Sequence, residues 1–527
     1  LEQITVQDVN DLDLATLAIT TQIKLAGLAE IQGELGNAKS IIEQAVLDVR
    51  NLAKRSPAEV QVNEVFGSSL FNLAAIVLNV GDYNAAKASG FEALNHYQQQ
   101  LTRHPENRRF QLGLANTLNL LATVDLETGR IVEAHQQFQS GYQVMEALVA
   151  NEPDRPDYLQ SLAMMAVSRG VAQRFLGDAK SEIAAYQEAL QAYRRLEIAL
   201  PDVPSIRQET ALTLADIGQL YLEYYNLESA RDVLIEAQEL YRGLAQQNEG
   251  APSYVEGYAV STEALARYYY LVGDFPSAFD LIKEAVGFFQ QLSESSPEII
   301  QHQFRYGLSL AMQAAIEQAG GAADVGTELI QQSISILNGL FEVSDGIPAY
   351  GNSLAQVHVQ QGDYLFDQGA VEEAATHWKR AMEIWQSLDL QASSVDIQER
   401  YLQFVVEHPS LKLRDSDEAK SLAVKIELEA DKSAHFLGTL ALWFEFSGDS
   451  EKANELLSQA EMFQLGHTVR PLLVQYIRTQ KEGAEGDPQA VKQVITQWHQ
   501  DHCPGDRQVI RLLQRLEQHY NKDIKER

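Results

Sequence analysis

The chain has 527 residues, of which 41 are basic and 73 acidic, so its formal net charge at pH 7 is −32. Nucleic acids and anionic membrane surfaces need a basic face, so this charge argues against both and favours basic or neutral partners. No apolar run approaches the roughly 18 residues of a membrane-spanning helix, and no signal peptide is recognisable, so we expect no direct membrane insertion of this segment.

A turn centred on one position recurs from the N-terminus with a 48-residue period. The residues at that position are Gly33, Gly81, Gly129, Gly177, Tyr225, Gly273, Gly321 and Gly369. Small residues, mostly alanine and glycine, stand seven residues before each turn and twelve after it. A register kept without insertion over this length indicates identical units stacked in a row. Stacked units form an extended surface, whose usual task is binding rather than catalysis.

Each repeat is predicted to be a hairpin of two helices. In the sixth, residues 254–272 carry apolar side chains at helical spacing, Gly273-Asp274 breaks the chain, and residues 274–292 form the second helix. The small residues allow the two helices to cross closely. The predicted fold class is therefore all-α, a right-handed α-solenoid of long hairpins.

Prolines recur at fixed positions in the repeats, and one repeat has a pair of glycines at its turn. Two sets of prolines follow the turns, each at its own fixed offset, and we interpret both as stops for the second helix. The first set is Pro57, Pro105, Pro153, Pro201 and Pro297, and the second is Pro156, Pro204, Pro252 and Pro348. In the seventh repeat, Gly320-Gly321 predicts a looser unit or a bend.

The regular register is predicted to end near residue 390. It would place the next turn at Asp417, but the next Gly-Asp pair is Gly448-Asp449. We therefore predict two domains, residues 1–390 with eight repeats and residues 391–527 as a helical subdomain. The second should contain at least one ordinary repeat, residues 437–460, and end in a polar capping helix from about Arg507.

The repeat motif resembles the tetratricopeptide repeat (TPR). The residues that carry the resemblance are Gly81-Asp82-Tyr83-x-x-Ala86, Ala93-Leu94, Gly177-Asp178 and Tyr186-x-x-Ala189-Leu190. The usual TPR period is about 34 residues, so a period of 48 means longer helices. This long period, with Pro-x-x-Pro after the second helix, resembles the C-terminal repeat regions of bacterial membrane-anchored serine/threonine protein kinases. The run from Tyr401 through Pro409-Ser-Leu411 and Asp415 to Leu437-Gly438-Thr439-Leu440-Ala441 resembles the end of those regions.

The resemblance implies the sensor or docking part of a signalling protein and not its catalytic part. The sequence contains no Gly-x-Gly-x-x-Gly loop, His-Arg-Asp run or Asp-Phe-Gly, so we expect no enzyme activity in this chain. Because it begins at Leu1, we interpret it as a piece of a longer protein. The kinases it resembles commonly carry this region outside the cytoplasm, so the resemblance favours a periplasmic location, with the cytoplasm as the alternative. The single cysteine does not decide between these compartments. Two alternatives stay open: a regulatory solenoid of a caspase-like protease or cyclase that docks an activating partner, and a hydrolase assembled from distant residues.

The first helix of each hairpin should line the concave face. Positions three, six, ten and thirteen before each turn then point inward, and many are apolar, as in a groove for a protein or peptide partner. The predicted binding residues are Phe71, Leu78, Leu126, Met164, Val167, Val171, Arg174, Arg267 and Tyr270. The alternative for the apolar ones is packing between helices. The arginines suit a carboxylate or phosphate, or they balance neighbouring acids. The cluster His499-x-x-His502-Cys503 lacks a complementary second cluster, so we predict no metal and no cofactor.

Overall fold

The computed structural model describes residues 12–176, 178–248, 251–344, 347–388, 395–408, 417–428, 434–463, 469–480, 487–505 and 509–517. These residues form helices and turns without a β-strand, which confirms the predicted all-α class. The chain divides into two compact units. Unit 1 comprises residues 1–176 and 181–203, and unit 2 comprises residues 177–180 and 204–527.

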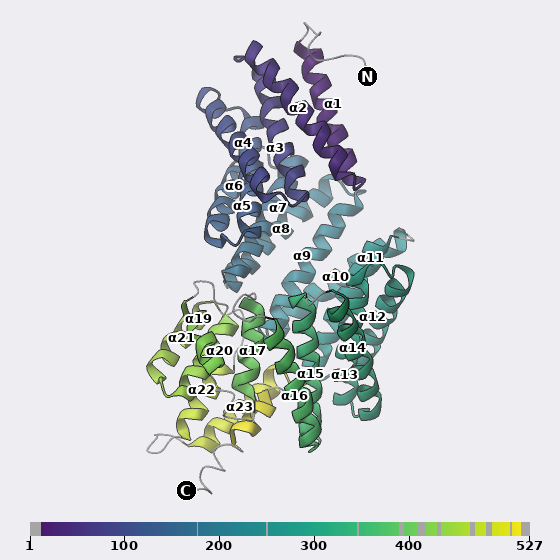
Figure 1. Cartoon of the computed structure of the whole chain (residues 1–527), viewed down its shortest axis with the longest axis vertical. Coiled ribbons are helices and arrows are strands. Elements are labelled where there is room, and N and C mark those ends of the chain that lie inside the picture. The colour runs from purple at the N-terminus through teal and green to yellow at the C-terminus, as the bar shows by residue number, and fades with distance from the viewer. Residues whose placement is uncertain are drawn as a thin grey trace. The chain divides into compact units, whose positions relative to one another are not determined.

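Eight hairpins follow one another with the predicted period (Figure 1). Every first helix begins one full period after the preceding first helix, and every second helix does the same. In unit 1 the helices are α1 (Leu12–Ile31), α2 (Leu35–Arg55), α3 (Val60–Asn79), α4 (Tyr83–Arg103), α5 (Arg108–Glu127), α6 (Ile131–Asn151), α7 (Pro156–Phe175) and α8 (Ala179–Ala199). In unit 2 they are α9 (Pro204–Glu223), α10 (Leu227–Gln247), α11 (Pro252–Leu271), α12 (Phe275–Ser295), α13 (Ile300–Ala319), α14 (Ala323–Val343), α15 (Pro348–Asp367) and α16 (Val371–Ser387).

The turn inside each hairpin needs a left-handed residue. The described turn glycines have positive φ, for example 84° at Gly81, a conformation that costs glycine nothing. Gly81 N donates to Leu78 O (2.8 Å) and Asp82 N to Val77 O (3.0 Å), which satisfies the last carbonyls of the first helix. The Asp82 carboxylate then accepts from Ala85 N and caps the second helix.

The small residues of the repeat lie where the two helices of a hairpin cross. Ala74 and Ala93 are fully buried, and their counterparts in the other repeats are buried as well. A Cβ added to Gly170 would lie 2.5 Å from the Tyr186 ring, and one added to Gly218 would lie 2.4 Å from a Leu234 methyl. The predicted reason for the small residues, close helix crossing, is thus confirmed.

Two local expectations differ from the structure. Pro156, Pro204, Pro252 and Pro348 are the first residues of α7, α9, α11 and α15 rather than stops for the preceding helix. Proline suits this position because its fixed φ is helical and its missing N–H would have had no partner in the helix. The seventh repeat is no looser than the first six, since α13 and α14 have 20 and 21 residues, as the helices of those repeats do.

The hairpins form two layers in each unit. Successive first helices contact one another, α1 with α3, α3 with α5 and α5 with α7, and unit 2 repeats this pattern from α9 to α15. Each second helix contacts its own first helix and, in most repeats, the next one. We call the side lined by the first helices the inner face of each unit.

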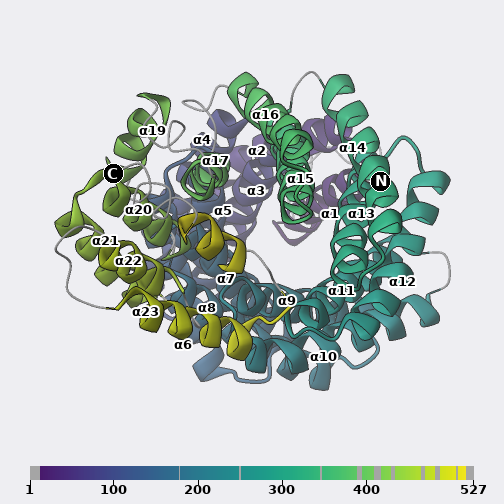
Figure 2. The same ribbon diagram turned by 90° about the horizontal axis from the view of Figure 1, so that it is seen from below.

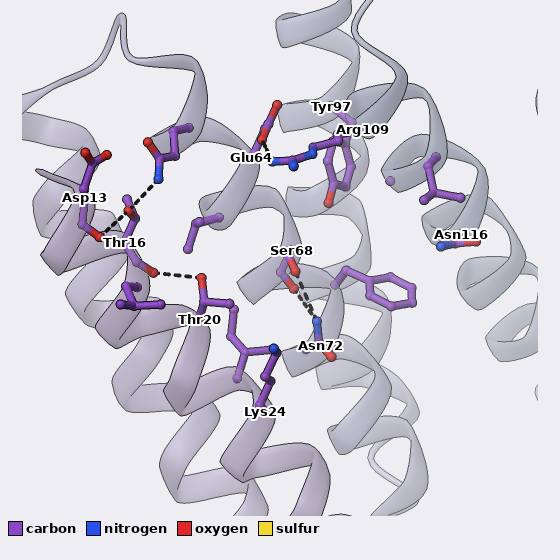
Figure 3. Close-up of a pocket in the computed structure, with 17 residues that line it drawn as sticks. Asp13, Thr16, Thr20, Lys24, Glu64, Ser68, Asn72, Tyr97, Arg109 and Asn116 are labelled. Atoms are coloured by element: carbon purple, nitrogen blue, oxygen red, sulfur yellow. Dashed lines mark hydrogen bonds and ion pairs between the residues drawn. The ribbon is translucent and has the colours of Figure 1, made fainter. Parts of the chain in front are cut away.

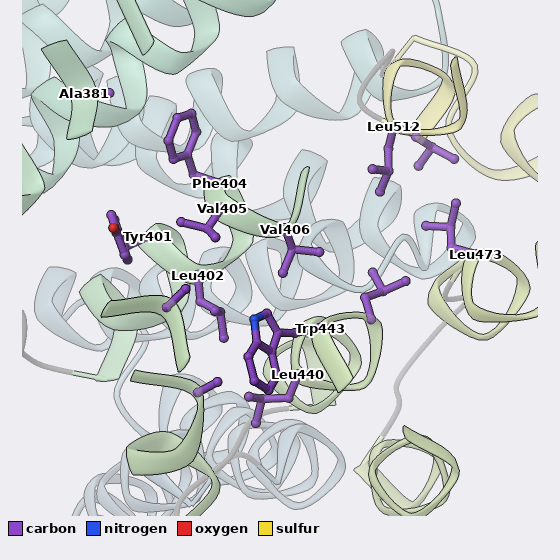
Figure 4. Close-up of a cluster of buried hydrophobic side chains, with 14 of the residues drawn as sticks. Ala381, Tyr401, Leu402, Phe404, Val405, Val406, Leu440, Trp443, Leu473 and Leu512 are labelled. Atoms are coloured by element: carbon purple, nitrogen blue, oxygen red, sulfur yellow. The ribbon is translucent and has the colours of Figure 1, made fainter. Parts of the chain in front are cut away.

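Unit 2 continues beyond the regular repeats with shorter helices. They are α17 (Val395–Glu407), α19 (Asp417–Leu428), α20 (Ala434–Ser447), α21 (Ser450–Phe463), α22 (Arg470–Thr479) and α23 (Pro488–His502), followed by a helix over residues 509–517. The predicted ordinary repeat is the hairpin of α20 and α21, with Gly448 left-handed at its turn. One apolar core joins α15 and α16 to all of these helices, and Tyr401, Trp443 and Leu512 lie in it (Figure 4).

The last helix is not the polar cap predicted from Arg507 onward. Val509, Leu512, Leu513 and Leu516 are buried in the core of unit 2. The predicted domain boundary at residue 390 lies inside unit 2, whose core spans it, and residues 391–527 as a separate subdomain stay a prediction.

Candidate functional site

A cavity of about 710 Å³ opens on the inner face of unit 1 (Figure 3). It is lined by α1, α3 and α5, as expected for a surface made of first helices. Leu17 contributes a large apolar side chain that is 62% exposed, and Ile23 and Phe71 lie beside it. An apolar side chain of this size facing water marks a site that a partner can cover.

Polar groups occupy one end of this cavity. The Arg109 guanidinium forms an ion pair with the Glu64 carboxylate at 2.6 Å, and Asn107 donates to the same carboxylate at 3.0 Å. Gln61 Nε2 donates to the Thr16 hydroxyl at 2.9 Å. Both interactions join neighbouring first helices, so they fix the spacing of the cavity walls.

A second cavity of about 300 Å³ shares Phe71 and Asn116 with the first and extends the site to α7. Leu78 and Met164 line it, and Met164 is 52% exposed. We call the two cavities together the groove. Methionine has a flexible, polarisable side chain and adapts to partners of different shape.

Amide side chains are distributed along the groove. Asn72 and Asn116 line the first cavity, and Asn79 and Asn119 the second. Asn119 Oδ1 is buried and accepts no hydrogen bond within the described part of the chain. An amide offers a donor and an acceptor together, which is what a peptide group requires. The groove therefore combines apolar surface with amide groups. Asn72 Nδ2 already donates to Ser68 O (2.8 Å) and Asn79 Nδ2 to Glu30 Oε1 (2.5 Å), so these two side chains offer their oxygens to a bound backbone.

Tyr97, which sequence reasoning missed, reaches the groove from the outer helix α4. Its ring passes between α3 and α5 where both lack a side chain, because a Cβ on Gly67 or Gly113 would lie 2.5 Å or 2.2 Å from ring atoms. Burial raises the pKa of the Tyr97 phenol, and the Glu64 carboxylate adds to the effect, so the group stays protonated. Gly67 and Gly113, two glycines inside helices, were the feature of the sequence that could have indicated this close approach.

The predicted binding residues do not all come together. Phe71, Leu78 and Met164 share the second cavity. Leu126 is half-buried against the cluster around Phe138, and Val167 and Val171 are also half-buried, so these three lie outside the lining of the two cavities.

The predicted cationic residues have other neighbours. The Arg174 guanidinium pairs with the Glu182 carboxylate at 2.7 Å and donates to the Tyr186 hydroxyl at 3.3 Å. Arg267 and Tyr270 belong to unit 2. Arg267 is exposed near Glu263, whose carboxyl pKa is raised by burial, an effect that Arg305 and Arg267 only partly offset.

The His499-x-x-His502-Cys503 cluster has packing partners instead. The His502 ring stacks on Trp498 with ring centroids 5.0 Å apart, and Cys503 is fully buried against Leu222 and Ala264. Among the described residues, no three His, Cys, Asp or Glu side chains are grouped as metal ligands.

Two helices of the groove, α1 and α3, have the length and apolar composition of a membrane span. In the structure both pack in hairpins, α1 against α2 and α3 against α4, and 44% of the α3 segment is buried. Buried helices of folded repeats share this composition, so the finding is weak support for a span.

No protein-family model matches the chain, and no curated protein matches it. Solved structures do. The apo form of RapI superposes with a TM-score of 0.50 at 9% identity, over 84% of this chain and 97% of RapI. A Rap protein complexed with Competence and Sporulation Factor gives 0.42 at 12% identity, over 85% and 98%. A tetratricopeptide repeat protein from Parabacteroides merdae gives 0.33 at 15% identity, over 63% and 96%.

The fold is a TPR-like α-solenoid. Identities this low establish the fold alone, so the activity of a TPR-like solenoid has to be argued from its own site. In this chain the candidate for that site is the open groove of unit 1.

Proposed function

We propose that the groove of unit 1 binds a segment of another protein, and that the chain is a non-catalytic binding scaffold. The observation that carries the proposal is the exposure of two large apolar side chains on one inner face. Leu17 in the first cavity and Met164 in the second are both more than half exposed, and the two cavities share lining residues. A bound apolar segment would remove this surface from water, worth about 25 cal/mol per Å² before the costs of association.

The chemistry of the groove defines the ligand class. Apolar side chains of the ligand would contact Leu17, Phe71 and Met164, and its backbone would pair with the asparagine amides. The charge of −32 favours basic flanks on either side of the apolar stretch. A peptide of mixed apolar and basic character is therefore the expected partner.

A random peptide library displayed on phage, selected against the chain, tests this proposal. We expect the selected peptides to bind the wild type and to lose at least about tenfold in affinity with Leu17→Glu or Met164→Glu, because a charge would be buried. Leu47→Glu in α2 is the matched control, since Leu47 is 50% exposed and lies outside the groove lining. Peptides that bind all three variants equally would contradict the proposal.

The finer proposal is that this scaffold is the sensor or docking region of a bacterial serine/threonine kinase signalling protein. It rests on the 48-residue period and on the Tyr401–Ala441 run. The sequence encoded upstream of Leu1 tests it. A membrane span preceded by an Asp-Phe-Gly motif supports the kinase, whereas a caspase-like or cyclase domain supports the alternative.

A further inference from the structure

The last described helices of the chain, drawn in yellow in Figure 2, lie against unit 2, and their contacts reach its inner face. We call α23, residues 503–505 and the helix 509–517 the C-terminal segment. Trp498 packs edge-on against Tyr225 in the turn between α9 and α10, with ring centroids 5.8 Å apart. Gly505 N donates to Leu271 O at the end of α11, at 3.0 Å.

The helix 509–517 reaches α15 with two arginines. The Arg511 guanidinium pairs with the Asp367 carboxylate at 2.6 Å, and that of Arg515 with Asp363 at 2.7 Å. The Arg515 guanidinium also lies 5.3 Å from the Trp378 ring centroid, within cation–π range. Burial alone would lower the pKa of Arg511, but the two aspartates raise it, so the pairs stay charged.

These contacts lie on the part of the unit 2 inner face whose equivalent in unit 1 is open. Asp363 and Asp367 stand six repeats after Ala75 and Asn79, which line the second cavity of the groove. Tyr270, whose carbonyl faces Gly505, stands four repeats after Leu78. The C-terminal segment therefore occupies, in unit 2, the face equivalent to the groove.

The backbone at two positions, Tyr225 and Gly505, is adapted to the docked C-terminal segment. Among the described residues, Tyr225 is the non-glycine with positive φ (53°), at a turn where the other described regular repeats have glycine. A left-handed tyrosine is strained by about 1–2 kcal/mol, and such strain persists where the surroundings demand the side chain. A Cβ on Gly505 would lie 1.5 Å from Tyr270 O, so the close approach requires glycine.

We propose that the inner face of unit 2 is a recognition site for a basic amphipathic helix, and that the C-terminal segment is its internal ligand. A partner helix of the same chemistry, with two arginines four residues apart beside a leucine face, takes its place in trans. The acidic pair Asp363 and Asp367 selects the arginines, and the apolar core of unit 2, in which Leu512, Leu513 and Leu516 are buried, selects the leucines. The proposal concerns unit 2 and is independent of the function proposed for unit 1.

A segment attached to its own site competes at an effective concentration of about millimolar. The site therefore opens only to a helix that binds more tightly than the internal ligand or that is present in excess. The docked segment thus sets the affinity or concentration that a partner helix must exceed in order to bind.

Cys503 makes the proposal measurable, because it is the only cysteine of the chain and is fully buried in the docked segment. The rate at which a thiol reagent labels it in the intact chain reports undocking. We expect Arg511→Glu with Arg515→Glu to label at least about tenfold faster than wild type while the far-ultraviolet circular dichroism is unchanged. Lys379→Glu with Arg380→Glu, which reverses two exposed charges on α16, is the matched control.

The second arm uses the wild-type chain and a synthetic peptide of residues 487–517 with Cys503→Ser. We expect the peptide to accelerate labelling in a saturable way, and the same peptide with both arginines changed to glutamate to have no effect. If the double variant does not fold, this arm alone decides. The proposal is overturned if the peptide has no effect, or if Cys503 becomes reactive only together with global unfolding in denaturant.

Discussion

The inner faces of unit 1 and unit 2 are built from the same repeat and are used differently. In unit 1 the positions of Ala75, Leu78 and Asn79 line an open cavity. In unit 2 the equivalent positions hold Asp363, Phe366 and Asp367, and the C-terminal segment covers them. The repeat thus fixes where a surface lies, whereas a few inner side chains decide what covers it.

The two units can be followed separately in solution. All four tryptophans, Trp378, Trp385, Trp443 and Trp498, belong to unit 2. Tryptophan emission therefore reports unit 2, and circular dichroism reports both units. The predictions below use this difference, in order of decreasing effect.

The largest effect is expected from Trp385→Ala in unit 2. Trp385 is 1% exposed, and its indole donates to Asn352 Oδ1 at 2.9 Å. Removing it leaves a cavity and a buried amide without its donor, so the free energy of unfolding of unit 2 should fall by about 3–5 kcal/mol. Urea unfolding followed by emission measures this change. A peptide selected on the groove should bind as before, and a loss of that binding would show that the units do not behave separately.

Asp125→Ala should lower the free energy of unfolding of unit 1. The buried Asp125 carboxylate accepts from Lys87 Nζ (2.7 Å), the Arg130 guanidinium (2.5 Å) and Gln137 Nε2 (2.8 Å), and so joins α4, α5 and α6. We expect a loss of about 1–3 kcal/mol, because the cations are themselves partly exposed.

The readout is a circular-dichroism transition that moves while the tryptophan transition does not. Arg50→Ala is the control, since it removes a half-exposed ion pair with Glu92 (2.7 Å) and should cost less than about 0.5 kcal/mol. A shift in the tryptophan transition with Asp125→Ala would break the comparison between units.

Acid should weaken unit 2 through His358. Its Nδ1 lies 3.0 Å from His377 Nδ1, and burial, together with the charges of His377 and Arg380, lowers its pKa from 6.5 to about 4. Between these values the unfolded chain binds a proton that the folded chain does not, so stability is complete above pH 6.5 and falls toward pH 4.

In His358→Gln the free energy of unfolding of unit 2 should fall by about 1–2 kcal/mol less on acidification than in the wild type, after allowance for solvent screening. The measurement is the difference between variant and wild type in urea unfolding at pH 7 and pH 4.5, read by emission. His104→Gln in unit 1 is the control. An unchanged pH dependence in the His358 variant would refute the assignment.

The smallest effect on stability is expected from Tyr225→Gly. Glycine relieves the left-handed strain but removes the contact with Trp498, and an aromatic pair is worth about 0.5–1.5 kcal/mol. The two terms oppose, so the free energy of unfolding should change by less than about 1 kcal/mol, while thiol labelling of Cys503 should become several-fold faster. Labelling at the wild-type rate would mean that Tyr225 does not hold the C-terminal segment.

The repeat register predicted most of the fold, because glycine turns and small crossing residues are local requirements with fixed spacing. It placed the hairpins and the lining of the groove by Phe71, Leu78 and Met164. It could not place the C-terminal segment, since a helix outside the register carries no information about which surface it meets. Tyr225 in a glycine position was the one visible trace of that contact. For Arg174 two roles were predicted, binding of a carboxylate or phosphate and the balancing of a neighbouring acid, and its guanidinium pairs with Glu182 at 2.7 Å.

The passage of Tyr97 between α3 and α5 makes the wall of the groove one side chain thick at that point. The phenol belongs to the inner cavity, whereas its backbone belongs to the outer layer. A ligand that fills the cavity at this point therefore touches a side chain of α4, although α4 itself lies behind α3 and α5. At this one position the outer layer of unit 1 contributes directly to the surface that a ligand would cover.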